Sequence, residues 1–516
     1  MRKAEPFDRL GGTCHFVAIP TRSVLPLIAL SALGVACNAT ISDTAGVGGS
    51  AAASPTAGAS GNGATGGTSA AGGTSGSGGS SGKSGGSGGS ATAVAGVTPV
   101  TRVARLTHTQ YQNTVNDLFG IEDDSSSAFA PDALDGFDFD TSIDFRVDAR
   151  LGPQYRAAAE TLAQRAVTDA AVFKRLVTCD TTAASCSKDF ITSFGQRAFR
   201  RPLTSAETDR FASLFAEGAD LVGSGDAFKD GVSLVVEAVL QSPQFLYRTE
   251  LGTQTGSDGL IALDGWEMAS RLSYFVWNTL PDDQLFASAK GNALASDADV
   301  QAAIARLIAD ARATSVAVSF HDQAWAFGRF ARISPDAKTY PKAPSDIAVR
   351  ATDAAHAFVG DVFESDGGLH ELLTAPYAFA DSGLAPLYGK SVSGSGMQRI
   401  DFEPTERKGI LMQVGYLASN AYSIKTDPIH RGLFVLRNLL CANIPNPPAG
   451  AAQTPAPATD NPPKTTRGEV ELLTGQSQCK GCHDSINPPG FAFEGFDAVG
   501  QIRKDEDGEA LDTTGS

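Results

Sequence analysis

A long stretch that cannot build a hydrophobic core limits where this chain can fold. Residues 38–97 are almost entirely Gly, Ser, Ala and Thr, and no large apolar side chains are spaced there to pack together. A segment of this composition behaves as a flexible coil, because it has too little apolar surface to bury. Folding is therefore predicted only from residue 98 onward, with 38–97 as a disordered linker.

The apolar run that precedes the linker indicates export. It extends from Ser23 to Cys37, which is too short to span a bilayer but matches the hydrophobic part of a signal peptide. The segment LGVAC resembles a lipobox, although Leu33 lies one position further from Cys37 than that motif usually places it. We predict a lipoprotein-type signal peptide over residues 1–37, lipidation of Cys37, and export to the periplasm or cell surface. Ordinary signal-peptidase cleavage near Cys37 is the alternative.

The net charge of the chain bears on which classes of molecule it can bind. Asp and Glu number 57 against 41 Lys and Arg, which gives a formal net charge of -16. Nucleic acid is therefore not predicted as a partner, because its phosphates require basic patches. No later run is long and apolar enough to span a bilayer, so membrane contact is predicted only through the lipid anchor.

Apolar residues recur at helical spacing through most of the remaining chain, and strand-like alternation is scarce. Thr204 with Glu207, and Asp264 with Glu267, have the spacing of helix capping boxes. The predicted fold class is mainly α, with several small helical bundles in series. The predicted units are 98–152, 153–252 with an Arg-Arg-Pro motif, 260–390, and 403–516 with the motif described next.

The pentapeptide CKGCH carries the strongest chemical signal. Cys479 and Cys482 lie three positions apart, so their thiols can form thioethers with both vinyl groups of one porphyrin. The adjacent His483 can then reach the iron as an axial ligand. Thr466 and Glu469 are predicted to cap the helix that delivers Cys479. We therefore predict one covalent haem c, held in a c-type-cytochrome-like helical segment at the C-terminus.

The surroundings of the motif leave its other ligands open. The segment SINPPGF after His483 is predicted as a rigid loop, whose carbonyl at Asn487 or Pro488 accepts a hydrogen bond from the second imidazole nitrogen. His430 is a candidate for the distal iron ligand, although its position also suits a helix-start residue. Met412 fits a core role better, and a five-coordinate iron is equally allowed.

Two other chemistries compete for CKGCH. A structural zinc site needs four ligands, and the motif supplies at most three with no second cysteine pair nearby. A redox-active CxxC disulfide normally sits in thioredoxin-like βαβ surroundings, which the helical pattern does not provide. Both alternatives stay open at this point.

Three further patterns carry local expectations. Cys179 and Cys186 bracket a short polar segment between two helical stretches, so we predict a disulfide there, as suits an oxidising compartment. Arg200 and Arg201 could pair with haem propionates, but a structural salt bridge is the expected role. An acidic loop could bind calcium, although it lacks the EF-hand spacing. Its carboxylates are Asp135, Asp138, Asp140 and Asp144.

Five segments resemble, in order, the multidomain envelope proteins built from domains of unknown function 1587, 1595, 1592 and 1588, which are related to planctomycete cytochrome-c proteins. The segments begin at Arg105, Phe194, Leu263, Arg407 and Cys479. The resemblance implies a secreted, cytochrome-like protein. A further C-terminal domain normally follows in this family, so the unit 403–516 is predicted to be truncated.

These observations favour an exported, lipid-anchored c-type haem protein that moves electrons to or from a redox partner protein. If the protein is an enzyme, it is expected to be a haem-dependent oxidoreductase. The alternative is a non-redox surface scaffold or binding protein, in which CKGCH is structural. The large helical bulk favours that alternative, because electron transfer alone does not require it.

Overall fold

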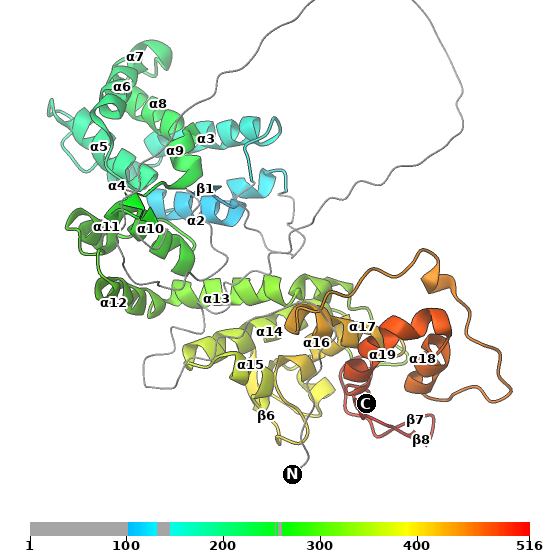
Figure 1. The fold of residues 1–516 in the computed structure, drawn as a ribbon. Helices are drawn as coiled ribbons and strands as arrows, with labels where there is room; N and C mark the ends of the chain where they lie inside the picture. Colours follow the sequence, from blue (N-terminus) through cyan, green and yellow to red (C-terminus); the bar gives the residue numbers. More distant parts are fainter. Residues whose placement is uncertain (1–101, 132–144, 253, 256–260, 516) are drawn as a thin grey trace, which may run out of the picture. The chain divides into compact units, whose positions relative to one another are not determined.

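The computed structural model describes residues 102–131, 145–252, 254–255 and 261–515, and these are mainly helical, as predicted (Figure 1). The predicted signal peptide, the linker 38–97, Cys37 and the acidic loop with Asp135 lie outside the described residues. Within the described part of the chain, no helix combines the length and apolar character that crossing a membrane requires.

The first hydrophobic core, called the N-terminal core, joins helices from both sides of residue 152. Its elements are β1 (Arg102–Arg105), α2 (His108–Phe119), η1 (Ser125–Ala128), α3 (Leu151–Thr168), α4 (Ala170–Leu176), α5 (Cys186–Phe199), α6 (Ser205–Ala216), α7 (Gly218–Leu221), α8 (Ala227–Gln241), α9 (Pro243–Leu246) and β2 (Tyr247–Glu250). Strand β1 pairs antiparallel with β2, with Val103 opposite Thr249. The predicted units 98–152 and 153–252 therefore share one core.

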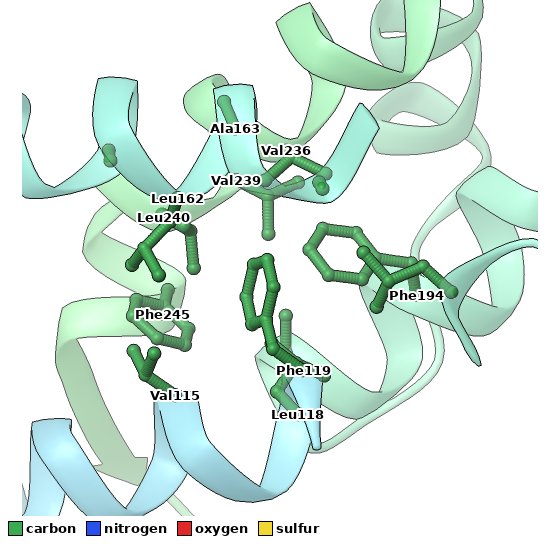
Figure 2. Close-up of a cluster of buried hydrophobic side chains, with 14 of the residues drawn as sticks. Val115, Leu118, Phe119, Leu162, Ala163, Phe194, Val236, Val239, Leu240 and Phe245 are labelled. Carbon is green, nitrogen blue, oxygen red and sulfur yellow. The ribbon is translucent and has the colours of Figure 1, made fainter. Parts of the chain in front are cut away.

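Side chains from α2, α3, α5 and α8 fill this core (Figure 2). Phe119 lies edge-on to Phe194, with ring centroids 6.3 Å apart, and Leu162, Val236 and their neighbours close around them. Each apolar side chain buried in this way contributes about 1.5–3 kcal/mol relative to exposure. The helical spacing of apolar residues thus becomes a single packed interior.

A second core, called the central core, begins after a two-stranded sheet. That sheet pairs β3 (Gln254–Thr255) with β4 (Ile261–Ala262). The core is built from α10 (Gly265–Val276), α11 (Asp283–Lys290), α12 (Asp297–Ile308) and α13 (Ala311–Ala324). Trp277 organises this core, because its indole N–H donates to the Leu307 carbonyl at 2.8 Å while the Arg312 guanidinium lies 3.6 Å from its ring centroid. Stacked cation and indole attract each other electrostatically.

A third core, called the C-terminal core, supports the rest of the chain. Its elements are η2 (Phe327–Arg332), α14 (Ile347–Glu364), α15 (Leu369–Thr374), β5 (Tyr377–Ala380), η3 (Ala385–Tyr388), β6 (Gln398–Asp401), η4 (Ile410–Met412) and α16 (Val414–Ser419). The remaining elements are α17 (Pro428–Phe434), the π-helical turn η5 (Val435–Leu439), η6 (Ala451–Gln453), α18 (Thr466–Thr474), α19 (Ser477–Phe491), β7 (Asp505–Glu506) and β8 (Glu509–Ala510). Phe493, Phe496 and Val499, just beyond α19, are buried in this core.

Both predicted capping boxes are present. Thr204 and Glu207 cap α6 reciprocally, and Asp264 and Glu267 do the same for α10. Arg201 forms two hydrogen bonds with the Glu207 carboxylate, at 2.8 and 2.9 Å, and this pairing holds the pKa of Glu207 down to about 2. The expected structural salt bridge of the Arg-Arg-Pro motif is therefore confirmed.

The neighbouring Arg200 also has a structural role. Its side chain is buried, and its Nη2 donates to the backbone carbonyls of Gln244, Phe245 and Tyr247. These bonds tie the end of α5 to the turn that leads into β2. Cys179 and Cys186 form a disulfide bond with their Cα atoms 5.5 Å apart, which closes the loop between α4 and α5.

Candidate functional site

Helix α19 carries the CKGCH motif in its first two turns. Cys479 is half-buried, and Cys482 is exposed. Because residues three apart on a helix lie on the same side, the two thiols face one direction about one turn apart. His483 follows directly and is half-buried. The motif therefore presents two thiols and one imidazole from a single rigid helix.

The N-cap of α18, the helix before the motif, lies one residue earlier than predicted. Thr465, not Thr466, is the N-cap of α18, and its hydroxyl accepts the backbone N–H of Gly468 at 3.2 Å. Thr466 instead directs its backbone N–H and its hydroxyl to the Glu506 carboxylate, at 2.8 and 2.7 Å. The prediction of Thr466 as the cap failed because its hydroxyl binds Glu506, a residue distant in the sequence.

The segment SINPPGF is not the predicted loop. Helix α19 continues through it to Phe491, with Pro488 and Pro489 inside the helix. Proline there removes the hydrogen bonds to the carbonyls four residues earlier, on Asp484 and Ser485. Both of those residues are exposed, so water can satisfy the freed carbonyls. The two prolines consequently sit in the last turn of α19 without ending it early.

His483 is held by a hydrogen-bonded chain that crosses from α19 to α18. Its Nδ1 lies 3.0 Å from Oδ1 of Asn487, one helical turn later. Nδ2 of Asn487 donates to Oγ1 of Thr474 at 2.8 Å, and that hydroxyl donates to the Val470 carbonyl at 2.6 Å. Asn487 and Thr474 are both buried. We call this chain, from His483 through Asn487 and Thr474 to Val470, the imidazole relay.

The predicted acceptor for the imidazole was the right residue but the wrong group. The side-chain oxygen of Asn487, not a backbone carbonyl, faces Nδ1 of His483. The i to i+4 spacing of these two residues could have indicated the contact. It was missed because the two prolines predicted a loop. Thr474, which belongs to α18, gave no signal in the sequence.

Helices α17 and α19 pack against each other through two glycines. A Cβ atom on Gly490 would overlap the carbonyl oxygen of Pro428, and one on Gly432 would overlap that of Ile486. These two contacts also set an antiparallel register between the helices, and η5 continues along α19 beyond them. We call this contact the glycine seam. At this contact the backbones of α17 and α19 approach so closely that no side chain fits between them.

The same register places His430 away from the motif. His430 is two residues from both Pro428 and Gly432, so it lies about 200° around α17 from the glycine seam. Its Nδ1 contacts Oδ2 of Asp427 at 2.5 Å, and its side chain is 60% exposed. This hydrogen bond raises the pKa of His430 above its ordinary value, against the opposing effect of partial burial. The structure therefore pairs His430 with Asp427 at the start of α17 rather than with His483.

A buried arginine secures the turn that follows α19. Arg431 is fully buried, and it lies 3.5 Å from Glu494, which is also fully buried. Arg503 approaches the other oxygen of Glu494 at 2.9 Å and continues to Glu506 at 3.0 Å. Carbonyls from two segments complete the set around Arg431. They belong to Leu417, Phe493, Phe496 and Asp497.

This ionic network reaches the start of α18. Glu506 is the residue that holds Thr466. Burial opposes ionisation of Glu506, but the hydrogen bonds from Thr466 and the charge of Arg503 outweigh it and keep its pKa below the usual range. The network thus connects α17, α18 and the segment after α19, and sequence reasoning identified none of it.

Four family models match the chain, each described as a protein of unknown function. They are DUF1587 at residues 104–168, DUF1595 at 186–250, DUF1592 at 263–389 and DUF1588 at 407–506. The chain belongs to the family of multidomain proteins built from these four domains. No curated protein and no solved structure matches the chain.

The DUF1588 match contains the whole candidate site. CKGCH, the imidazole relay, the glycine seam and the buried ionic network all lie between residues 407 and 506. That model also has a cytochrome-derived short name, PSCyt3. The other three matches cover the N-terminal core, the central core and part of the C-terminal core.

The zinc and disulfide alternatives for CKGCH would use the same Cys479, Cys482 and His483. Cys479 and Cys482 are not bonded to each other. Within the described residues, no three His, Cys, Asp or Glu side chains gather closely enough to hold a metal ion. Met412 packs against the C-terminal core, and its sulfur accepts the backbone N–H of Lys408 at 3.2 Å. The described chain therefore presents the thiols and the imidazole without a preformed zinc site.

Proposed function

We propose that this protein carries one covalent c-type haem and transfers electrons in the cell envelope. The observation that carries the proposal is the arrangement on α19: two thiols on one face, beside an imidazole whose Nδ1 is occupied by Asn487. Nε2 is then the nitrogen available to a metal. When bound, a haem iron supplies one-electron oxidation and reduction.

The residues present fit the attachment side of such a group. Cys479 and Cys482 would hold the porphyrin through thioethers, and His483 would supply the proximal nitrogen. Metal-binding histidines usually donate their second N–H to a fixed acceptor, and Asn487 has that position here. The cytochrome-derived name of the matching family model supports the same assignment.

The proposal extends to location and partner. Lipidation at Cys37 and the linker 38–97 would tether the folded part to a membrane, within reach of a redox partner protein. The disulfide between Cys179 and Cys186 supports an oxidising compartment, where such bonds persist. Replacing Cys37 with Ser should move the protein from the membrane fraction to the soluble fraction. Unchanged membrane association would contradict the anchor.

The decisive experiment is expression of the full chain with cytochrome c maturation machinery. The wild-type band should stain for haem on a denaturing gel, and the double variant Cys479→Ala/Cys482→Ala should lose the stain completely. The matched control is Cys179→Ala/Cys186→Ala, which removes the other cysteine pair and should keep the stain. A colourless wild-type protein would overturn the proposal and favour a non-redox binding protein.

A further inference from the structure

We propose that Asn487 and Thr474 are positioning residues for His483, and that the imidazole relay fixes which ring nitrogen carries the proton. Resting on the proposed function, we infer that the same relay sets the reduction potential of the attached haem. The site is therefore tuned by a side-chain relay between two helices, rather than by a single backbone carbonyl.

The direction of every hydrogen bond in the relay follows from its last member. The Val470 carbonyl can only accept, so the Thr474 hydroxyl must donate its one proton to it. The Thr474 oxygen then accepts from Asn487, which must present its NH₂ group to it. The Asn487 carbonyl oxygen is left facing His483 and can only accept. The proton must consequently sit on Nδ1, and the lone pair on Nε2.

Burial protects this polarity from water. Asn487 is 7% exposed and Thr474 is 5% exposed, so solvent cannot replace either partner. A reversed Asn487 amide would place its carbonyl oxygen against the Thr474 oxygen, whose one proton is already donated to Val470, so two acceptors would face each other. The relay also spans α18 and α19, so the imidazole orientation depends on how these two helices pack. A loss of that packing would release the ring.

The tautomer can be measured without haem. Long-range ¹⁵N–¹H spectra of the haem-free full chain, at about pH 8 where an ordinary imidazole is neutral, should show His483 protonated only at Nδ1. Asn487→Leu should convert it mainly to the Nε2–H form, and Thr474→Val should give a mixture, because the amide loses its acceptor. Thr474→Val changes little volume and keeps the fold testable. An Nε2–H wild type, or identical spectra in all three proteins, would overturn the proposal.

The potential provides a second readout on the haem-loaded protein. Asn487→Asp places a carboxylate on the Nδ1 proton, which makes the imidazole a stronger donor and should shift the potential to more negative values. Ser485→Asp is the matched control, because it adds the same charge on an exposed position of α19 with no reach to Nδ1. The shift in Asn487→Asp should be clearly larger than in the control.

The outcomes separate this inference from the proposed function. If no haem attaches to the wild-type protein, the proposed function fails, while the tautomer measurement still tests the relay. If haem attaches but Asn487→Asp and Ser485→Asp shift the potential equally, the relay does not tune the site, and this inference is overturned.

Discussion

Two cysteine pairs in this protein have opposite states. Cys179 and Cys186, separated by seven positions, are joined in a disulfide, and Cys186 is fully buried. Cys479 and Cys482 are closer in sequence, yet they are not bonded to each other, and Cys482 is exposed. Proximity along the chain therefore does not decide whether two thiols pair.

The backbone between the cysteines explains the difference. A disulfide needs Cβ atoms about 3.5–4.5 Å apart, whereas residues three apart on a helix hold them about 5–6 Å apart. A turn separates Cys179 from the start of α5 and brings the first pair together. Helix α19 keeps the second pair apart and parallel. The thiols of the N-terminal region are joined in a disulfide, whereas those of the motif region stay free to react.

The two regions also contain different buried arginines, Arg200 in the N-terminal region and Arg431 in the motif region. Replacing Arg431 should give the largest effect on stability. Arg431→Met leaves the buried Glu494 with Arg503 and the Thr426 hydroxyl, and it leaves several carbonyls without a donor, so we expect a loss of about 3–5 kcal/mol in the motif region. Hydrogen exchange with mass spectrometry should show the loss in α17–α19 and not in α3 or α8. The exposed Arg156, replaced by Met, should cost less than about 1 kcal/mol. Equal loss of protection in both regions would show that they unfold as one unit.

The glycine seam should give the next largest effect. Gly490→Ala inserts a methyl group against the Pro428 carbonyl, which we expect to cost about 3 kcal/mol through forced separation of the helices. Gly481→Ala, in the same helix, meets no atom within 4 Å. That control should be neutral or stabilise α19 by up to about 1 kcal/mol, because Ala favours helix. Similar exchange behaviour in the two variants would mean that the seam is not tight.

Removal of the disulfide should affect the other region. The double variant Cys179→Ala/Cys186→Ala loses the cross-link over a short loop, which corresponds to about 2.5 kcal/mol. Exchange should rise in α4, α5 and their neighbours while α17–α19 keep their protection. Cys479→Ala/Cys482→Ala, measured without haem, should change stability by less than about 0.5 kcal/mol. A larger effect there would indicate that these thiols have a structural role.

Helix caps should give a smaller and more even effect. Thr204→Ala on α6 and Thr465→Ala on α18 each remove a hydroxyl that accepts a backbone N–H, at a cost of about 1 kcal/mol. Local exchange at the first turn of each helix is the appropriate measurement. If Thr465→Ala leaves α18 unchanged, the contact of Thr466 with Glu506 would suffice to start that helix.

The smallest expected effect concerns pH and two histidines. Asp427 raises the pKa of His430 in the folded state, so this contribution is complete below the unfolded pKa of about 6.5 and is lost as pH rises through the higher folded value. Burial lowers the pKa of His321, so its contribution has the opposite sign and is lost as pH falls. Because His430 is largely exposed, we expect its pairing with Asp427 to contribute less than about 1 kcal/mol to the free energy of unfolding.

Urea unfolding of wild type and His430→Gln between about pH 5.5 and pH 8 should show a stability difference that shrinks as pH rises. A difference that grows with pH would contradict the assigned pairing. His321→Gln provides the comparison of opposite sign.

Much of the fold could be predicted from the spacing of residues close together in the sequence. The helical periodicity, the capping boxes at Thr204 and Asp264, and the short loop between Cys179 and Cys186 all concern neighbours in sequence. Such interactions can be predicted because the backbone geometry of one helix or turn defines them. At the candidate site, the same reasoning identified Cys479, Cys482 and His483 as a group.

The remaining features depend on distant partners. Glu506 takes Thr466 away from its expected cap, and Arg431 lies buried among segments from α16 to beyond α19. Pro488 and Pro489 predicted a loop because their neighbours were unknown, whereas α19 tolerates them where the freed carbonyls face water. Long-range packing decides these cases, since its energy exceeds the local preferences of single residues.

The sequence by itself determined that the folded chain is mainly helical and that two thiols and an imidazole lie within five consecutive residues, because both follow from spacing along one backbone. Only the tertiary structure decided which nitrogen of His483 is held. That depends on a buried amide and a hydroxyl from two packed helices, and on the fact that the carbonyl at the end of the relay can only accept a proton.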